Sequence, residues 1–218
     1  MTGLPQAVIF DCDGTLADTE PISDRAWADV LRERGYVPTE VDARTTVGRP
    51  YRETFAHFDA RVPLGDPAVF RRALRERFLA RFATELELFE DTVGLLRTLA
   101  GRGVPIGVAS SSTHAHVVRV LDRAGVRALV NVVVGSDDVT RHKPDPEPYL
   151  AAARLLDAVP GRSLAVEDTD VGVASARAAG LFTIAVVRGH VPAGDLAAAD
   201  RVVSTVSLEV LEAGPWTS

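Results

Sequence analysis

The chain has 218 residues, of which 46% are hydrophobic, and its formal net charge is -6. This length allows one sizeable core with a small satellite domain beside it. An acidic balance argues against nucleic acid or an anionic membrane as a partner, because both need clustered Lys and Arg. No apolar run approaches the roughly 20 residues that span a bilayer. The N-terminus lacks the pattern of a secretory signal, and a single cysteine cannot form an intramolecular disulfide. We therefore expect a cytoplasmic protein.

Short apolar runs alternate with segments of helical periodicity along most of the chain. The runs that we predict as strands are residues 7–10, 105–109, 130–134, 164–166, 182–186 and, more weakly, 201–203. The segments that we predict as helices between them are residues 91–102, 114–124, 147–156 and 170–179. This alternation predicts an α/β fold, a doubly wound parallel sheet with helices on both faces.

One segment after the first predicted strand breaks this alternation. Residues 17–88 carry helical periodicity only, as in residues 23–34 and 67–82. We interpret residues 17–88 as a small helical domain inserted after the first strand. Residues 1–16 and 89–218 then form the α/β core domain.

Polar side chains follow successive predicted strands, at the points where ligands bind in an open parallel sheet. These residues are Asp11, Asp13, Ser110, Lys143, Glu167 and Asp168. Lys143 is the only lysine, although Lys and Arg together number 24. A cluster of carboxylates, a hydroxyl group and a lone ammonium group are therefore expected to converge on one crevice.

Several carboxylates in one crevice repel one another, by about 4 kcal/mol for a pair 4 Å apart at an effective dielectric constant of 20. A hard divalent cation with oxygen ligands relieves this repulsion, and Mg²⁺ with several retained waters fits. A calcium-binding loop starting at Asp11 is excluded, because Leu16 and Ile22 stand where that loop needs Gly and Glu. The sequence therefore predicts a magnesium site.

These segments resemble the four motifs of the haloacid dehalogenase superfamily. They are most similar to its subgroup with a helical cap, which includes β-phosphoglucomutase and phosphoglycolate-type phosphatases. The residues that carry the resemblance are Asp11-Cys12-Asp13-Gly14-Thr15-Leu16, Ser110, Lys143-Pro144-Asp145-Pro146, Glu167-Asp168 and the turn Gly48-Arg49-Pro50. They occur in order and cover the chain almost end to end, so the resemblance is specific.

The resemblance implies a role for each matching residue. Asp11 would be the nucleophile that forms an aspartyl-phosphate. Asp13 would protonate the leaving oxygen and then activate water, and its backbone carbonyl would contact the metal. Asp168 would be the second carboxylate on the metal, with Glu167 a ligand either directly or through water. Two further residues, Ser110 and Lys143, would bind the phosphoryl oxygens, and Arg49 is a candidate substrate contact.

The expected function is a Mg²⁺-dependent phosphatase that hydrolyses a small phosphomonoester, such as a sugar phosphate, through an aspartyl-phosphate. Two alternatives stay open: a sugar-phosphate mutase of the β-phosphoglucomutase type, and a non-catalytic binding or regulatory module on the same scaffold. The mutases carry a histidine just inside the cap and a lysine before the cap glycine, where this chain has Ser23 and Val47. This difference favours the phosphatase.

Four other residues near the motifs could contribute to the site or to the fold. His114 and His116 lie two residues apart at the start of a predicted helix and do not share a face, which argues against a metal role. Cys12 is expected to be an inert buried thiol. Asp170 could support the metal through water or cap the helix that follows it.

Overall fold

The chain divides into two compact units. The computed structural model describes residues 3–46 and 51–216. The larger unit comprises Met1–Ala17 and Leu88–Ser218, and the smaller comprises Asp18–Glu87. The short strands β2 (Ala17–Asp18) and β3 (Glu87–Leu88) lie where the chain passes from one unit to the other.

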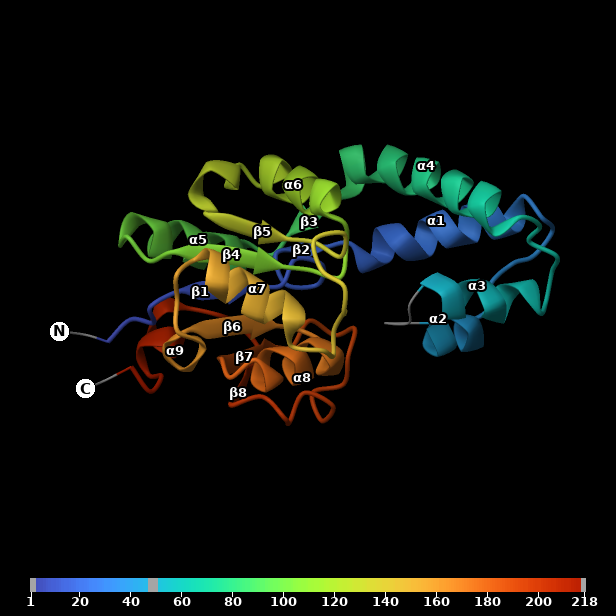
Figure 1. Cartoon of the computed structure of the whole chain (residues 1–218). Helices are drawn as coiled ribbons and strands as arrows, with labels where there is room; N and C mark the ends of the chain where they lie inside the picture. Colours follow the sequence, from blue (N-terminus) through green and yellow to red (C-terminus); the bar gives the residue numbers. More distant parts are fainter. Residues whose placement is uncertain (1–2, 47–50, 217–218) are drawn as a thin grey trace. The chain divides into compact units, whose positions relative to one another are not determined.

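A parallel sheet forms the centre of the larger unit (Figure 1). Within the described ranges it has six strands in the order β5-β4-β1-β6-β7-β8. Their bounds are β1 Val8–Phe10, β4 Ile106–Ala109, β5 Val132–Val134, β6 Leu164–Glu167, β7 Phe182–Val186 and β8 Arg201–Val203. The order reverses at β1, which is hydrogen-bonded to β4 on one side and β6 on the other. This is the switch point at which ligands bind in doubly wound sheets, and the predicted fold class is confirmed.

Helices cover both faces of this sheet. They are α5 Glu90–Gly101, α6 His114–Arg123, α7 Glu147–Leu155, α8 Asp170–Ala178 and α9 Leu208–Glu212, with 3₁₀ turns at Arg127–Leu129 and Pro160–Arg162. Ile9, Ala109 and Tyr149 belong to one buried cluster between the sheet and the pair α7 and α8. Because both faces are covered, every residue of β1 is buried, and the strand reads in the sequence as a continuous apolar run.

Four helices form the smaller unit in its described residues: α1 Glu20–Arg32, α2 Glu40–Thr46, α3 Tyr51–Asp59 and α4 Pro67–Glu85. Asp66 caps α4 by accepting hydrogen bonds from the backbone N–H groups of Ala68 and Val69. The ring of Trp27 packs against those of Phe58 and Phe70, so this tryptophan belongs to the core of the unit.

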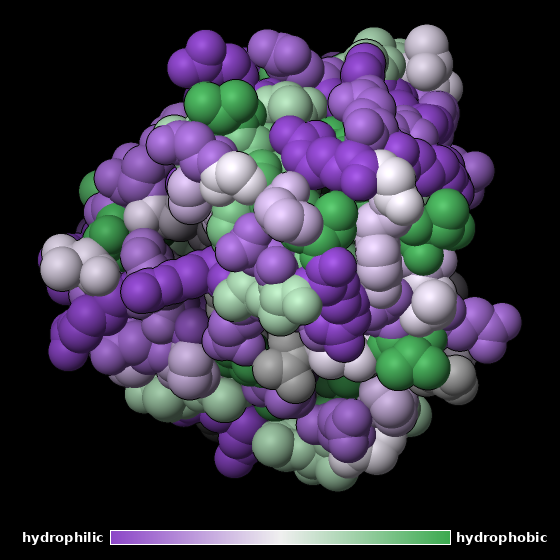
Figure 2. All heavy atoms as spheres, turned by 90° about the vertical axis from the view of Figure 1, so that its right-hand side faces the viewer, coloured by the Kyte–Doolittle hydropathy of each residue, from purple (hydrophilic) through white to green (hydrophobic). Residues whose placement is uncertain are grey.

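Large hydrophobic side chains on the surface belong to separate elements. Among the residues that the structure describes, the exposed ones are Val37, Val41, Val69, Leu129, Leu155, Val159, Val171 and Val202. On the face drawn in Figure 2, hydrophobic residues are interspersed with hydrophilic ones. Among the described residues, no helix combines the length and the apolar character that a membrane crossing requires.

Candidate active site

The carboxyl ends of three neighbouring strands place the first site residues. Asp11 directly follows β1, Ser110 follows β4, and β6 ends at Glu167 with Asp168 next in the chain. The backbone hydrogen bonds of the sheet extend into this edge, from Asp11 N to the carbonyl of Val166 and from Ser110 N to that of Val134. The sheet therefore fixes the backbone under each of these side chains.

Lys143 joins two of the carboxylates. It lies in the loop between β5 and α7, and its side chain is 4% exposed. The Nζ atom lies 2.6 Å from Oδ1 of Asp11 and 2.6 Å from Oε1 of Glu167. Burial lowers the pKa of Lys143, but the negative charges of Asp11 and Glu167 prevail, so its pKa lies well above the ordinary value. The ammonium group therefore stays charged at this site.

Both oxygens of Glu167 are occupied by donors of the protein. Besides Lys143, Oε1 accepts a hydrogen bond of 2.8 Å from the hydroxyl of Tyr149, a fully buried side chain on α7. Oε2 accepts bonds from the backbone N–H groups of Asp168 and Thr169 and from the hydroxyl of Thr169. A buried carboxylate with this many donors is held firmly in one position.

Asp11, Glu167 and Asp168 together make an acidic cluster, with one oxygen from each lying within 4.8 Å of the others. Burial is the main cause that raises the pKa of Asp11 well above its usual range, against the opposing charge of Lys143. Burial, and then the charges of Asp11 and Glu167, raise the pKa of Asp168 in the same way. One lysine therefore does not compensate the cluster.

The carboxylate oxygens of this cluster are suitable ligands for a divalent cation. Oδ1 of Asp11 is bonded to Lys143 and Oδ1 of Asp168 accepts from Thr15, at 3.1 Å. Within residues 3–46 and 51–216, the Oδ2 atoms of Asp11 and Asp168 accept no hydrogen bond from the protein. Two uncommitted carboxylate oxygens in a buried acidic cluster are the ligands that a hard cation such as Mg²⁺ prefers.

Two glycines allow the backbone to approach the carboxylates of Glu167 and Asp168 closely. A Cβ atom on Gly14 would lie 2.0 Å from Oδ2 of Asp168, and one on Gly172 would lie 1.9 Å from Oε1 of Glu167. Gly14 also has a φ of 85°, a conformation that L residues rarely adopt. Gly14 therefore allows the turn after β1 and also leaves room for Asp168.

Asp13 is held by two partners from the neighbouring strand and helix. The hydroxyl of Ser110 donates to its Oδ2 atom at 3.3 Å, and Nε2 of His116 lies 2.8 Å from Oδ1. Burial lowers the pKa of His116, but the charge of Asp13 and the hydrogen bond to it prevail, so the pKa is raised. The two sides of the Asp13 carboxylate are thus engaged by different elements.

The remaining sequence-predicted residues lie as follows. Arg49 and Val47 fall outside the described residues. Cys12 is fully buried, and burial is the first cause that raises the pKa of its thiol well above the ordinary value, as suits an inert core residue. Asp170 is not the helix cap: α8 begins at Asp170, and the hydroxyl of Thr169 caps it by accepting from Gly172 N.

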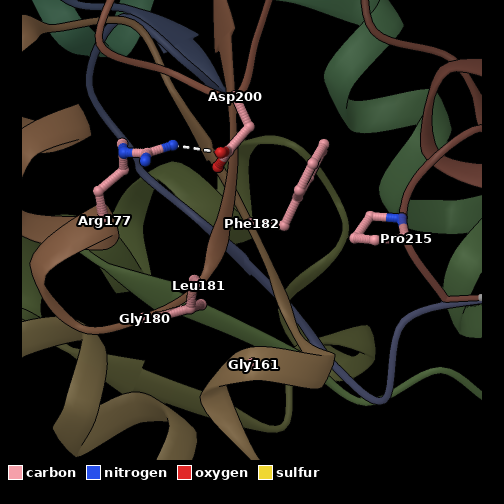
Figure 3. A pocket seen from close by; sticks show the side chains of 7 residues that line it. All are labelled: Gly161, Arg177, Gly180, Leu181, Phe182, Asp200 and Pro215. Carbon is pink, nitrogen blue, oxygen red and sulfur yellow. Dashed lines mark hydrogen bonds and ion pairs between the residues drawn. The ribbon is translucent and has the colours of Figure 1, made fainter.

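A cavity of about 300 Å³ lies at the opposite edge of the sheet, where β6 and β7 begin (Figure 3). Its lining residues are Gly161, Arg177, Gly180, Leu181, Phe182, Asp200 and Pro215. The charged groups among them, Arg177 and Asp200, form an ion pair with each other, as the dashed line shows. This cavity is therefore separate from the acidic cluster at the carboxyl ends of the strands.

A known protein family matches most of the chain. The family model of the haloacid dehalogenase-like hydrolases matches residues 8–186. The chain belongs to this family. The match begins in β1 and ends with β7, so it contains the three strand ends and the Lys143 loop described above.

Similar members of the haloacid dehalogenase-like hydrolases include several phosphatases. Validoxylamine A 7'-phosphate phosphatase of Streptomyces hygroscopicus subsp. limoneus is 30% identical, over 93% of this chain and 94% of that protein. Fructose-1-phosphate phosphatase of Escherichia coli (strain K12) is 31% identical, over 81% of this chain and 94% of that protein. A crystal structure of CbbY from Rhodobacter sphaeroides in complex with xylulose-1,5-bisphosphate has a TM-score of 0.77 and 31% identity, over 93% and 95% of the two chains.

Sequence reasoning missed two residues of this hydrolase site. Tyr149 reads in the sequence as one more core aromatic, and only the fold shows that its hydroxyl reaches Glu167. For His116 the sequence suggests only a metal role together with His114, and the spacing of the two residues argues against it. His114 does not contact the site, since its Nδ1 atom pairs with Asp138. The available signal for His116 was its distance of six residues after Ser110, at the start of the helix that follows β4.

Proposed function

We propose that this hydrolase cleaves small phosphomonoesters, in particular sugar phosphates, with Mg²⁺ and through a phosphorylated Asp11. The supporting observation is the buried Asp11–Lys143–Glu167 arrangement beside Asp168, at the switch point of the sheet. Two similar proteins point to the substrate class, one named for fructose 1-phosphate and the other bound to xylulose-1,5-bisphosphate.

In the first step the Asp11 carboxylate attacks phosphorus while the bond from phosphorus to the alcohol oxygen breaks. Asp13 gives its proton to that oxygen, and the alcohol leaves. In the second step Asp13 takes a proton from a water molecule that attacks the phosphoryl group, and the carboxylate of Asp11 is restored. Each step is easier than direct attack of water on the ester.

We assign the metal to Asp11 and Asp168, each of which has an uncommitted oxygen, together with the backbone carbonyl of Asp13. Glu167 has the different task of anchoring Lys143, because both of its oxygens are already occupied. Any contact between Glu167 and the metal would then run through water. When bound, Mg²⁺ supplies positive charge that offsets the repulsion between the Asp11 carboxylate and the phosphate.

Two residues are placed to stabilise the transferring phosphoryl group. Lys143 is buried beside the nucleophile, where a fixed positive charge acts more strongly than in water. Ser110 carries a hydroxyl at the same edge of the sheet and is 2% exposed. Arg49 is proposed as a further substrate contact, on the basis of the family resemblance alone.

The test is release of inorganic phosphate from a panel that includes fructose 1-phosphate, phosphoglycolate and other sugar phosphates, with Mg²⁺ or with EDTA. We expect at least one sugar phosphate to be hydrolysed with Mg²⁺ and none with EDTA. Full activity in EDTA, or no hydrolysis of any phosphomonoester, would refute the proposal.

A phosphomutase of the β-phosphoglucomutase type would share all the core residues. We favour the phosphatase, because Ser23 on α1 offers no imidazole where those mutases carry a histidine. Incubation with β-glucose 1-phosphate, Mg²⁺ and a trace of the bisphosphate separates the two reactions. Rapid formation of glucose 6-phosphate with little free phosphate would show a mutase.

A further inference from the structure

His116 makes a contact with Asp13 that the roles assigned above do not use. Its Nε2 atom lies 2.8 Å from Oδ1 of Asp13, and its side chain is 15% exposed. On the other side of the same carboxylate, the hydroxyl of Ser110 reaches Oδ2. The side chain proposed to move protons is therefore held on both of its oxygens.

The local fold fixes the position of the imidazole ring. Helix α6 starts just after the loop that follows Ser110, and Ser112 N donates to the Ser110 hydroxyl at 2.9 Å. His116 lies in the first turn, where its N–H donates to the carbonyl of Thr113. Val117, next in the chain, is fully buried. The ring thus projects from a short anchored turn rather than from a free loop.

We propose that His116 is a positioning residue that aims the Asp13 carboxyl group at the leaving-group oxygen; this inference rests on the proposed function. A carboxyl group donates a proton efficiently only within hydrogen-bond distance of the receiving oxygen. When a substrate binds, Ser110 is needed for the phosphoryl oxygens and its bond to Asp13 is given up. The contact from His116 lies on the other carboxylate oxygen, so it can persist through this exchange.

If His116 positions Asp13 as the general acid, the effect of replacing His116 should depend on the leaving group of the substrate. An alkyl phosphate, such as a sugar phosphate, loses a strongly basic alkoxide that must be protonated as the ester bond breaks. An aryl phosphate, such as p-nitrophenyl phosphate, loses a stable phenolate that needs little protonation. Because kcat/KM covers the steps up to alcohol release, the ratio of kcat/KM for the two substrates reports on the acid step alone.

The experiment compares wild type, His116→Phe and His116→Gln on a sugar phosphate and on p-nitrophenyl phosphate. His116→Phe keeps a ring but has no N–H group. We expect it to lower kcat/KM by about 10- to 100-fold more for the sugar phosphate than for the aryl phosphate. This is a fraction of the rate enhancement that a general acid typically contributes, because the acid itself, Asp13, is still present. His116→Gln keeps an N–H donor of similar reach, and we expect it to restore most of this difference.

His114→Gln is the matched control, since His114 lies on the same helix and pairs with the exposed Asp138. It should leave the ratio between the two substrates unchanged. Thermal unfolding of each variant shows whether the fold is intact. Equal losses on both substrates in His116→Phe, or no loss, would overturn the inference. Failure of the wild-type protein to hydrolyse either substrate would instead refute the proposed function.

Discussion

The Oδ2 atom of Asp168 lies 2.0 Å from the point where a Cβ atom on Gly14 would stand. The loop after β1 therefore packs directly against the carboxylate that follows β6, with no space for a side chain between them. Any side chain at residue 14 has to displace the carboxylate that we assign to the metal.

Gly14→Ala should lower Mg²⁺ affinity by about 10- to 100-fold, the usual effect of disturbing the surroundings of a metal ligand. The readout is the Mg²⁺ dependence of phosphate release. Gly103→Ala is the control, because Gly103 has a similar φ of 73° but nothing within 4 Å of its Cβ position. Both changes carry a backbone cost of roughly 1–2 kcal/mol. Equal Mg²⁺ affinities in the two variants would contradict our assignment of Asp168.

Lys143→Arg should lower kcat/KM by about 100-fold or more, although the positive charge is kept. The buried Nζ atom contacts two carboxylates at 2.6 Å, and a planar guanidinium group is larger and directs its N–H groups differently. Arg141→Lys makes the reverse change two residues away, at a side chain that is 68% exposed, and should have little effect. A Lys143→Arg enzyme close to wild type would mean that the lysine is incidental.

Tyr149→Phe should reduce the free energy of unfolding by about 1–3 kcal/mol, because it leaves a buried oxygen of Glu167 with one donor fewer. Urea denaturation measures this change. In Tyr51→Phe the lost bond goes to the carbonyl of Pro67 in an exposed position, so a smaller effect is expected. We also expect Tyr149→Phe to lower kcat more than it changes KM, since Lys143 is anchored through Glu167. Unchanged stability would show that the hydroxyl bond is not formed in solution.

Asp168→Asn should raise the melting temperature of the metal-free enzyme and remove the stabilisation that Mg²⁺ gives. The change removes one of three carboxylate charges that lie within 4.8 Å of one another. Thermal unfolding in EDTA and in Mg²⁺ tests both effects without an activity assay. Wild type should gain stability on addition of Mg²⁺, because the metal binds the folded state. A large Mg²⁺ shift in Asp168→Asn would place the metal elsewhere.

The strands, and with them most of the candidate site, could be predicted from the sequence because buried parallel strands are short apolar runs. Once Val8–Phe10 and Leu164–Glu167 are recognised, the topology brings Asp11 and Asp168 to one edge. In the smaller unit the periodicity of residues 23–34 and 67–82 predicts the two long helices α1 and α4. The predicted ends differ from the observed ones by at most three residues. The shorter α2 and α3 were not expected as separate helices, because segments of this length carry too little periodicity.

Contacts between side chains of different elements could not be predicted in this way. The approach of His116 to Asp13 depends on the rotation of α6 over the sheet, which the helical pattern alone leaves open. The bond from Tyr149 to Glu167 likewise depends on the depth at which α7 packs. Both residues looked like ordinary members of a helix, because their partners lie 103 and 18 residues away in the chain.

The most direct test of the account is to locate the phosphoryl group during turnover. The enzyme is mixed with a hydrolysed sugar phosphate and Mg²⁺, quenched in acid within the first turnovers, digested and analysed by mass spectrometry. We expect one phosphoryl group on the peptide that contains Asp11, and none in Asp11→Asn, which should also release no phosphate. A phosphoryl group on another residue, or full turnover by folded Asp11→Asn, would contradict the covalent mechanism.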